Sequence, residues 1–222
     1  MFVNPREAIE QGWIKFPDHF TEADKEKCIQ PNAIDFTVDR LFQIAPAGVF
    51  VISEDLKIMK NQTEMYATPQ PLIHEQSGWV LSGGAFDFLS DFYIKVPDGV
   101  AAYLVPRSTF VRNGVTVTSG LYDTGFEGNV GGVIFCNGNV AAIGKGTRIG
   151  QLIFVRSDTS GKTYAGGYNG AVGQHWTAAV EEKAAAEPEV TAESTPEPEV
   201  VPVEVTPAVT TGKQSKRANK GA

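Results

Sequence analysis

The residues best suited to chemistry lie between positions 106 and 128, where the sequence reads PRSTFVRNGVTVTSGLYDTGFEG. Arg107, Ser108 and Thr109 follow directly on the strand-like run AAYLVP. A guanidinium, two hydroxyls and turn amides at the end of a strand can together hold phosphate oxygens. Arg112 comes soon after and could point at the same pocket. On spacing alone, arginines on an exposed loop without a ligand remain an equal alternative.

The second candidate group is the acidic turn GLYDTGFEG in the same window. Asp123 lies in this turn, and Gly120, Gly125 and Gly128 surround it. A carboxylate beside bound phosphates can orient a water held by Mg²⁺, or it can act as a general base. The two groups together predict a site for a phosphorylated anion.

Several other kinds of site are excluded by the rest of the sequence. The three histidines (His19, His74 and His175) and the two cysteines (Cys28 and Cys136) have no metal-ligand spacing, so a zinc-activated water is not expected. The sequence also lacks a Walker A loop, a Rossmann glycine fingerprint and a G-x-S-x-G elbow. A net charge of −7 argues against binding to a nucleic-acid polymer, which needs a basic surface.

The cellular compartment is predicted from three features of the chain. The first residues, MFVNPREAIEQGW, lack the apolar core of a signal peptide. There is no run of about 18 apolar residues that could cross a bilayer. Two lone cysteines do not form a disulfide framework and suit a reducing compartment. We therefore expect a cytoplasmic protein with no membrane partner.

The elements that must position these groups are mostly strands. Short apolar or alternating runs are separated by Gly, Pro, Asn and Asp: GVFVIS, FDFLSDFYIKV, AAYLVP, GVTVTS, NVGGVIF, NVAAI and RIGQLIFV. No long helical period interrupts them. This pattern predicts a mainly β barrel or jelly roll. Before it, NPREAIEQGWI predicts a short amphipathic helix that Asn4 caps and Pro5 begins.

The composition changes after residue 176. Residues 177–222 contain no aromatic side chain and five of the 13 prolines. Such a segment buries too little apolar surface to offset its ordering entropy, so we expect a disordered tail. Its basic end, GKQSKRANKGA, is either an interaction tag or simply solvated. We therefore predict a folded domain at 1–176 and a tail at 177–222.

The motifs of the domain resemble those of the trimeric dUTPase and dCTP deaminase superfamily. RSTFVRNG, GLYDTGFEG and GKGTRIGQLIF resemble three superfamily motifs in their order. IQPNAIDFTVDRLFQI is similar to the segment that opens dCTP deaminases, and YAGGYNGAVG is similar to their C-terminal arm. The resemblance runs from residue 1 to about 176. It implies a distorted jelly roll of the dUTPase type.

The resemblance also implies which residues hold the phosphates of a pyrimidine deoxynucleoside triphosphate. Arg107, Ser108 and Thr109 would hold the triphosphate. Asp35 would organise a Mg²⁺–triphosphate indirectly, through water. Gln151 would belong to a strand that contacts the phosphates or a neighbouring subunit. Sites in this superfamily form between the subunits of a homotrimer, so assembly would be needed for activity.

The remaining implied residues surround the sugar and the reacting atoms. Asp123 would lie beneath the deoxyribose and, in a hydrolase, would activate the attacking water. Arg112 is its companion in the catalytic set. Phe126 would pack on the sugar and disfavour a ribose. Tyr168, with Gly170 and the glycines around it, would form the arm that closes over the nucleotide.

The sequence departs from the deaminase pattern at three places. The deaminases carry a water-activating glutamate on the strand after the acidic turn, and this chain has Val133 there. Valine can neither take nor give a proton. The base-reading segment, 114–123, is about two residues shorter than in those enzymes. In the arm, Gly167, Ala171 and Val172 stand where the deaminases have lysine and glutamines.

Three functions follow from this comparison. A dUTP diphosphatase, which forms dUMP and pyrophosphate, is favoured because its reaction needs phosphates, Mg²⁺ and an oriented water but no strand glutamate. A dCTP deaminase is the alternative, supported by the N-terminal segment, Arg112 and the arm. A non-catalytic trimer that binds nucleotides or serves assembly is the third. The base specificity is left open.

Overall fold

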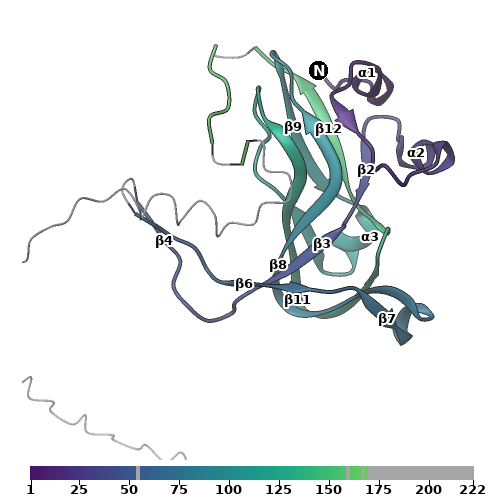
Figure 1. Ribbon diagram of the computed structural model, residues 1–222, viewed down its shortest axis with the longest axis vertical. Helices are drawn as coiled ribbons and strands as arrows, with labels where there is room; N and C mark the ends of the chain where they lie inside the picture. Colours follow the sequence, from purple (N-terminus) through teal and green to yellow (C-terminus); the bar gives the residue numbers. More distant parts are fainter. Residues whose placement is uncertain (54–55, 159–160, 167, 170–222) are drawn as a thin grey trace, which may run out of the picture. The chain divides into compact units, whose positions relative to one another are not determined.

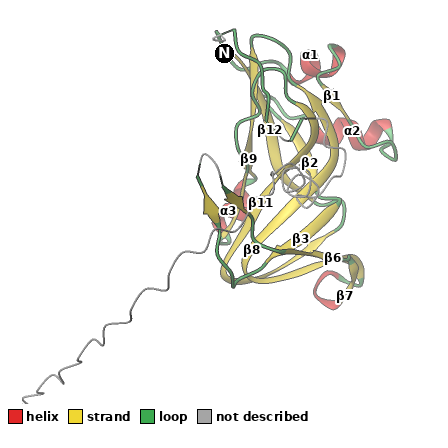
Figure 2. Ribbon diagram, turned by 60° about the vertical axis from the view of Figure 1, so that its left-hand side comes forward, coloured by secondary structure: helices red, strands yellow, loops and turns green. Residues whose placement is uncertain are grey.

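The computed structural model describes residues 1–53, 56–158, 161–166 and 168–169 (Figure 1). The helices within these residues are α1 (Pro5–Glu10), α2 (Glu22–Cys28) and α3 (Ser108–Arg112), with a 3₁₀ turn at Pro71–Ile73. The strands are β1 (Ile14–Lys15), β2 (Ile34–Thr37), β3 (Arg40–Ile44), β4 (Val51–Ile52), β5 (Lys57–Ile58), β6 (Gln62–Met65), β7 (Thr68–Gln70), β8 (Gln76–Lys95), β9 (Val100–Pro106), β10 (Val115–Thr118), β11 (Glu127–Gly144) and β12 (Arg148–Arg156). Figure 2 shows that strands make up most of this body.

The strands form two main sheets. The larger sheet has the order β10-β11-β8-β3-β6, and β1 and β7 also pair with β8. The smaller sheet has the order β2-β12-β9, and β4 and β5 pair only with each other. The long antiparallel pair of β8 and β11 runs from Glu127 opposite Lys95 to Gly144 opposite Gly78, with two register shifts. Such shifts bend a strand and allow a sheet to curve around a core.

The core lies between the two sheets. Alternate residues of β8 are buried, among them Phe86, Phe88 and Phe92, as the alternating run FDFLSDFYIKV predicts. Phe88 stacks on Phe36 of β2, with ring centroids 5.7 Å apart and planes at 14°. This contact joins the larger sheet to the smaller one. The predicted mainly β jelly roll is therefore confirmed.

The N-terminal helix is also confirmed, although it is shorter than the predicted stretch. The Asn4 side chain accepts a hydrogen bond from the Arg6 amide at 2.9 Å, and Pro5 is the first helical residue. Ala8 is fully buried against the body. The cap and the proline therefore perform the roles that the sequence assigns to them.

Two helices were not predicted. α2 begins with a capping box between Thr21 and Asp24, and Cys28 is its one buried residue within the helix. A helix of this kind has no apolar period to reveal it, but the T-x-x-D spacing of TEAD is a signal that could have found it. α3 occupies residues 108–112, which we expected to lie in a turn or loop at the end of a strand.

The runs NVGGVIF and NVAAI are parts of one strand, β11, rather than two strands. The intervening Asn and Gly residues predict a turn, but they form a bulge between Cys136 and Val140. Gly138 lies in that bulge with φ of +71°, a conformation that glycine adopts without strain. These Asn and Gly residues therefore mark a bulge inside a strand, and not the predicted turn between two strands.

By its contacts the chain divides into two units, Met1–Ala185 and Ala186–Ala222, and every described residue belongs to the first. The predicted boundary at 176 and the predicted disordered tail lie outside the described residues. No helix in the described part of the chain is long and apolar enough to cross a bilayer.

Candidate functional site

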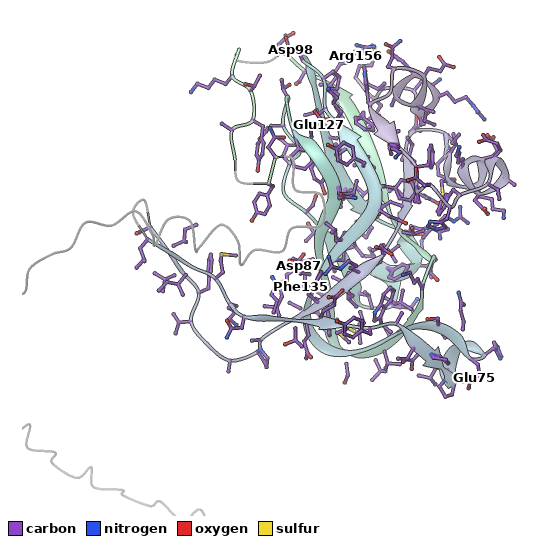
Figure 3. The ribbon with its side chains drawn as sticks, in the orientation of Figure 1. Glu75, Asp87, Asp98, Glu127, Phe135 and Arg156 are labelled. Atoms are coloured by element: carbon purple, nitrogen blue, oxygen red, sulfur yellow. The ribbon has the colours of Figure 1, made fainter. Side chains whose placement is uncertain are left out.

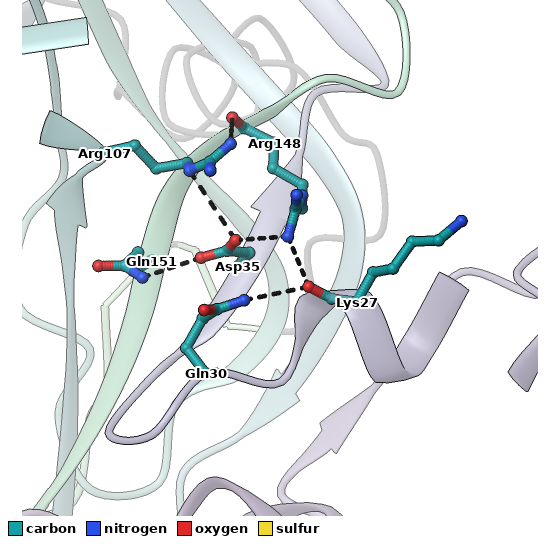
Figure 4. A network of polar contacts seen from close by, with 6 residues as sticks. All are labelled: Lys27, Gln30, Asp35, Arg107, Arg148 and Gln151. Atoms are coloured by element: carbon teal, nitrogen blue, oxygen red, sulfur yellow. Dashed lines mark hydrogen bonds and ion pairs between the residues drawn. The ribbon is translucent and has the colours of Figure 1, made fainter. Parts of the chain in front are cut away.

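Asp35 is the centre of a buried polar network (Figure 4). Its side chain is 1% exposed, and it lies on β2 directly opposite Gln151 of β12. Gln151 donates from Nε2 to Asp35 Oδ1 at 2.9 Å, and Arg148 donates from Nη1 to Oδ2 at 3.0 Å. Arg107 approaches Oδ2 with its Nε at 3.9 Å. Gln151 and Arg148 come from β12, which pairs with β2, and Arg107 follows β9, which pairs with β12, so strand register brings these side chains together.

The two arginines have further partners that fix their position. Arg107 Nη1 donates to the backbone carbonyl of Arg148 at 3.2 Å. Arg148 Nη1 also donates to the carbonyl of Lys27 at the end of α2, and the Gln30 side chain donates to the same carbonyl at 3.0 Å. These bonds satisfy a carbonyl that the helix itself leaves unpaired. Two guanidinium groups around one carboxylate leave a net charge of +1, which suits an anion.

The hydroxyl residues of the predicted phosphate group lie next to this charge. Ser108 and Thr109 are exposed in the first turn of α3, and Arg107 precedes that turn. Arg112 is exposed at the last position of α3. Residues four apart share one side of a helix, so Ser108 and Arg112 face the same way. Ser108, Thr109 and Arg112 thus lie within one short helix directly after Arg107.

Asp123 lies at a cavity of about 360 Å³ near the other end of β9. Its side chain is exposed, and Lys162 and Tyr164 line the same cavity. The turn that presents Asp123 is fixed by its neighbours: the Thr124 hydroxyl donates to the carbonyl of Val100 at 2.8 Å. An exposed carboxylate at such a cavity can act as a general base toward water.

An aromatic cluster supports this turn from inside. The Tyr122 hydroxyl donates to the carbonyl of Gly131 at 2.6 Å and accepts from the amide of Gly131 at 3.0 Å. Burial raises the pKa of Tyr122 to about 12. Phe126 is 5% exposed, because Tyr122 and Tyr164 cover its ring at centroid distances of 4.9 and 5.5 Å. A sugar could reach Phe126 only by displacing a ring, so the predicted sugar contact stays a prediction.

The start of the predicted arm is attached to the body. The Asn169 side chain accepts a hydrogen bond from the amide of Glu127 at 2.8 Å. Tyr168 beside it is 42% exposed, and its carbonyl lies close to Gly128. Gly128 suits this close approach, because a Cβ atom would lie only 3.1 Å from the Phe126 ring. Gly170 and the rest of the arm lie outside the described residues.

The phosphate group and Asp123 are not brought together within one chain. Ala102 pairs with Tyr122, so Asp123 lies beside Ala101 at the start of β9. Arg107 follows the last residue of the same strand. Six residues of strand at about 3.3 Å each separate the two positions by about 20 Å. Within one chain the two groups therefore lie at opposite ends of β9.

Val133 lies in β11 between two polar neighbours. It is directly opposite Thr118 of β10 on one side and Asp87 of β8 on the other. The position where the deaminases have a glutamate thus has a carboxylate as its cross-strand neighbour. Sequence reasoning missed Asp87, because its nearness to Val133 depends on the register of two strands that are far apart in the sequence.

The described residues do not form a protein-built Mg²⁺ site. No group of three or more His, Cys, Asp or Glu side chains among them could hold a metal ion. Both carboxylate oxygens of Asp35 already accept hydrogen bonds from Gln151 and Arg148. A Mg²⁺ ion at this site would have to be held mainly by substrate phosphates and water, which is a common arrangement for this ion.

Known proteins of one family match most of the described residues. The model of the dCTP deaminase-like family (DCD) matches residues 6–157. A deoxyuridine 5′-triphosphate nucleotidohydrolase of Methanocaldococcus jannaschii is 30% identical over 152 residues, which cover 68% of this chain and 94% of the relative. A dUMP-forming dCTP deaminase of Sulfurihydrogenibium sp. is 33% identical over 150 residues, covering 65% and 79%.

A solved structure of 2′-deoxycytidine 5′-triphosphate deaminase from Agrobacterium tumefaciens is also similar. Its TM-score is 0.47 at 15% identity, and the match covers 67% of this chain. The match spans 45% of the length of that protein.

Proposed function

The chain belongs to the dCTP deaminase-like family, and we propose that it hydrolyses dUTP to dUMP and pyrophosphate. The observation that carries the proposal is the exposed carboxylate of Asp123 at an open cavity, together with Val133 where a deaminase would need a glutamate. Hydrolysis of the α–β phosphoanhydride needs a base near water and positive charge near phosphate. Asp123 is the candidate base, and Arg107 and Arg112 are the candidate positive charges.

The proposed reaction uses the two groups, at Arg107 and at Asp123, in different roles. Asp123 accepts a proton from water as the water oxygen attacks the α-phosphorus. The bond between the α-phosphorus and the bridging oxygen breaks, and pyrophosphate leaves. Arg107, Ser108 and Thr109 hold the triphosphate, and Arg112 stabilises the charge that develops on it. Mg²⁺ would enter with the triphosphate and supply additional charge neutralisation.

We further propose that the active form is a homotrimer with sites between subunits. The separation of about 20 Å between Arg107 and Asp123 supports this, because a second copy can place its Arg107 beside the first copy's Asp123. A contact between different patches of identical chains closes into a ring when the rotation fits. Size-exclusion chromatography with light scattering tests the assembly directly.

The test of the activity is incubation with Mg²⁺ and each of dUTP, dCTP and dTTP, with products separated by chromatography. We expect dUMP and pyrophosphate from dUTP. Asp123→Asn should lower the rate about 10²- to 10⁴-fold, the usual effect of losing a general base, with an unchanged oligomer. Asp98→Asn, which changes another exposed aspartate in a loop, is the matched control and should keep full activity.

Two results would reject the proposal. A trimer that releases no pyrophosphate from any of the three nucleotides would point instead to a nucleotide-binding or structural protein. Unchanged turnover in Asp123→Asn would remove that residue from its role. Ammonia release from dCTP would support the second candidate, dCTP deamination, which the 33% identical relative named as a dUMP-forming dCTP deaminase favours.

A further inference from the structure

A two-stranded hairpin extends from the edge of the larger sheet. It joins β3 to the edge strand β6, and we call its described residues, 45–53 and 56–61, the β4–β5 hairpin. At its base the Ala45 amide donates to the carbonyl of Asn61 at 2.9 Å. Near its tip the Ser53 amide donates to the carbonyl of Leu56 at 2.7 Å. Figure 1 shows β4 at the far end of this hairpin, away from the strands of the two main sheets.

The β4–β5 hairpin exposes apolar side chains on both of its faces. Phe50 and Ile52 are two residues apart in the chain and share one face, whereas Val51 and Ile58 are paired on the other. The large apolar side chains of the hairpin that are between 47% and 73% exposed are Val49, Phe50, Ile52, Leu56 and Ile58. The body of the same chain therefore leaves this apolar surface open to water.

Such a hairpin needs a partner for physical reasons. β4 and β5 pair only with each other among the described strands, and a ribbon of two strands is marginally stable in water unless a third strand or an apolar surface covers it. The outer edges of the two strands also present backbone groups that another chain can pair with. Single exposed apolar residues are ordinary, but a continuous group of five marks an interaction surface.

A second exposed apolar surface lies on β11 of the same chain. Phe135, labelled in Figure 3, is 39% exposed, and it points away from the core because Ile134 and Cys136 on either side are each 1% exposed. Val140 is 63% exposed beyond the bulge. Their partners on β8 are three residues apart, which places the two side chains about 10 Å from each other along the strand. We call Phe135 and Val140 the β11 patch.

We propose that the β4–β5 hairpin of one subunit binds the β11 patch of a second copy of this chain. Because the two surfaces are different, each copy gives its hairpin to one neighbour and its patch to another, and such a contact closes into a ring when the rotation fits. The inference rests on the proposed function, since this ring is the homotrimer that would bring a neighbour's Arg107 to Asp123.

A second copy fits the two surfaces better than other partners do. The net charge of −7 opposes binding to a nucleic acid or to an anionic membrane. An unrelated protein on the hairpin would leave the β11 patch exposed. A copy of this chain carries one hairpin and one patch, so a closed ring covers both surfaces on every subunit.

The first test is the double variant Phe50→Asp/Ile52→Asp of the full chain, with its mass measured by light scattering. The dissociation constant of the assembly should rise at least about 100-fold, because two apolar anchors are lost from the interface. Both side chains are at least half exposed within one chain, so the circular dichroism spectrum should be kept. Leu72→Asp is the matched control, because Leu72 is 68% exposed on the 3₁₀ turn of another hairpin, and its variant should remain a trimer.

The second test shows that the contact joins two different surfaces. Val140→Asp should also dissociate the assembly, because it places a charge in the β11 patch. A mixture of Val140→Asp and Phe50→Asp/Ile52→Asp offers one intact hairpin and one intact patch, so it should form particles of two chains. A variant that failed to fold could not complement the other in this way.

The outcomes separate this inference from the proposed function. A wild-type trimer that persists in Phe50→Asp/Ile52→Asp or in Val140→Asp overturns the inference and leaves the proposed trimer in place. A mixture that forms no particle of two chains also overturns the inference. A monomeric wild type rejects the inference and the trimer together. An assembly that responds to the variants as expected but does not hydrolyse dUTP rejects the diphosphatase and keeps the inference.

Discussion

The two polar regions at the ends of β9 balance their charges in different ways. At the C-terminal end, Arg107 and Arg148 surround Asp35, whose side chain is 1% exposed. At the N-terminal end, Asp123 and Lys162 are exposed at a cavity. The first region is held together by protein groups, whereas the second is open to water.

This difference indicates what each region contributes. A buried carboxylate that binds two arginines fixes their position for a ligand. Removing it leaves two arginine charges without their partner, which lowers the stability of the fold. An exposed carboxylate can be changed with little effect on folding, because water replaces its contacts. We therefore expect loss of the buried Asp35 carboxylate to affect stability, and loss of the exposed Asp123 carboxylate to affect turnover.

The largest expected effect on stability comes from Asp35→Ala. It removes the acceptor of Gln151 and the counter-charge of two arginines, and breaking a buried pair in this way costs about 3–5 kcal/mol. Urea denaturation of the variant would measure the free energy of unfolding. Because Arg107 and Arg148 are each about one third exposed, water can recover part of the loss, which favours the lower end of that range.

Glu26→Gln is the control for Asp35→Ala. It removes an ion pair with Arg6 that is as short as 2.6 Å, but both side chains are more than half exposed. Exposed pairs contribute about 1 kcal/mol or less. Equal destabilisation by the two variants would mean that the burial of Asp35 does not increase its contribution to stability.

Tyr122→Phe should have an intermediate effect at the other end of β9. It removes both hydrogen bonds to Gly131 and leaves a partly buried amide and carbonyl unpaired, at a cost of about 2 kcal/mol. Because the ring stays in place, Asp123 keeps its position and the rate of dUTP hydrolysis should fall less than about threefold. A large loss of turnover would show that the Asp123 region depends on internal support after all.

The same variant carries a prediction about alkaline pH. The pKa of Tyr122 is 10.0 when exposed and about 12 in the folded chain, because burial disfavours the phenolate. Its contribution to stability is therefore complete below pH 10 and is lost as the pH rises towards 12. Urea denaturation at pH 8 and pH 11 should show a smaller loss of stability for Tyr122→Phe than for the wild type. An equal loss of stability in the two proteins would mean that groups other than Tyr122 cause the alkaline sensitivity.

Much of the fold could be predicted from local patterns. The alternating run FDFLSDFYIKV gave the buried face of β8, and Asn4 with Pro5 gave the start of α1, because these signals lie within a few residues of one another. α2 was missed because the helix has no apolar period, and only its capping box could have revealed it. The bulge at Gly138 was taken for a turn, because the same residue types serve both.

The sites were predicted less completely, because their contacts depend on register. The motifs gave Arg107 and Asp123, but they did not show that about 20 Å of β9 separates the two. Asp35 meets Gln151 only because β2 and β12 pair at that point. Asp87 meets Val133 across β8 and β11, whose register is shifted by two irregularities. The register between two strands that are far apart in the chain cannot be predicted from a single sequence.

The smallest expected effect is that of Ser108→Ala. Ser108 is exposed on α3, so its loss should change the free energy of unfolding by less than about 0.5 kcal/mol. If its hydroxyl donates to a phosphate, the variant loses a charge-assisted hydrogen bond and the KM for dUTP should rise about tenfold with kcat nearly unchanged. Ser77→Ala, an exposed serine of β8 outside both regions, should leave both constants unchanged. A fall in kcat with constant KM would mean that Ser108 acts in the transition state alone, and the Arg107 end would then take part in the chemistry as directly as Asp123.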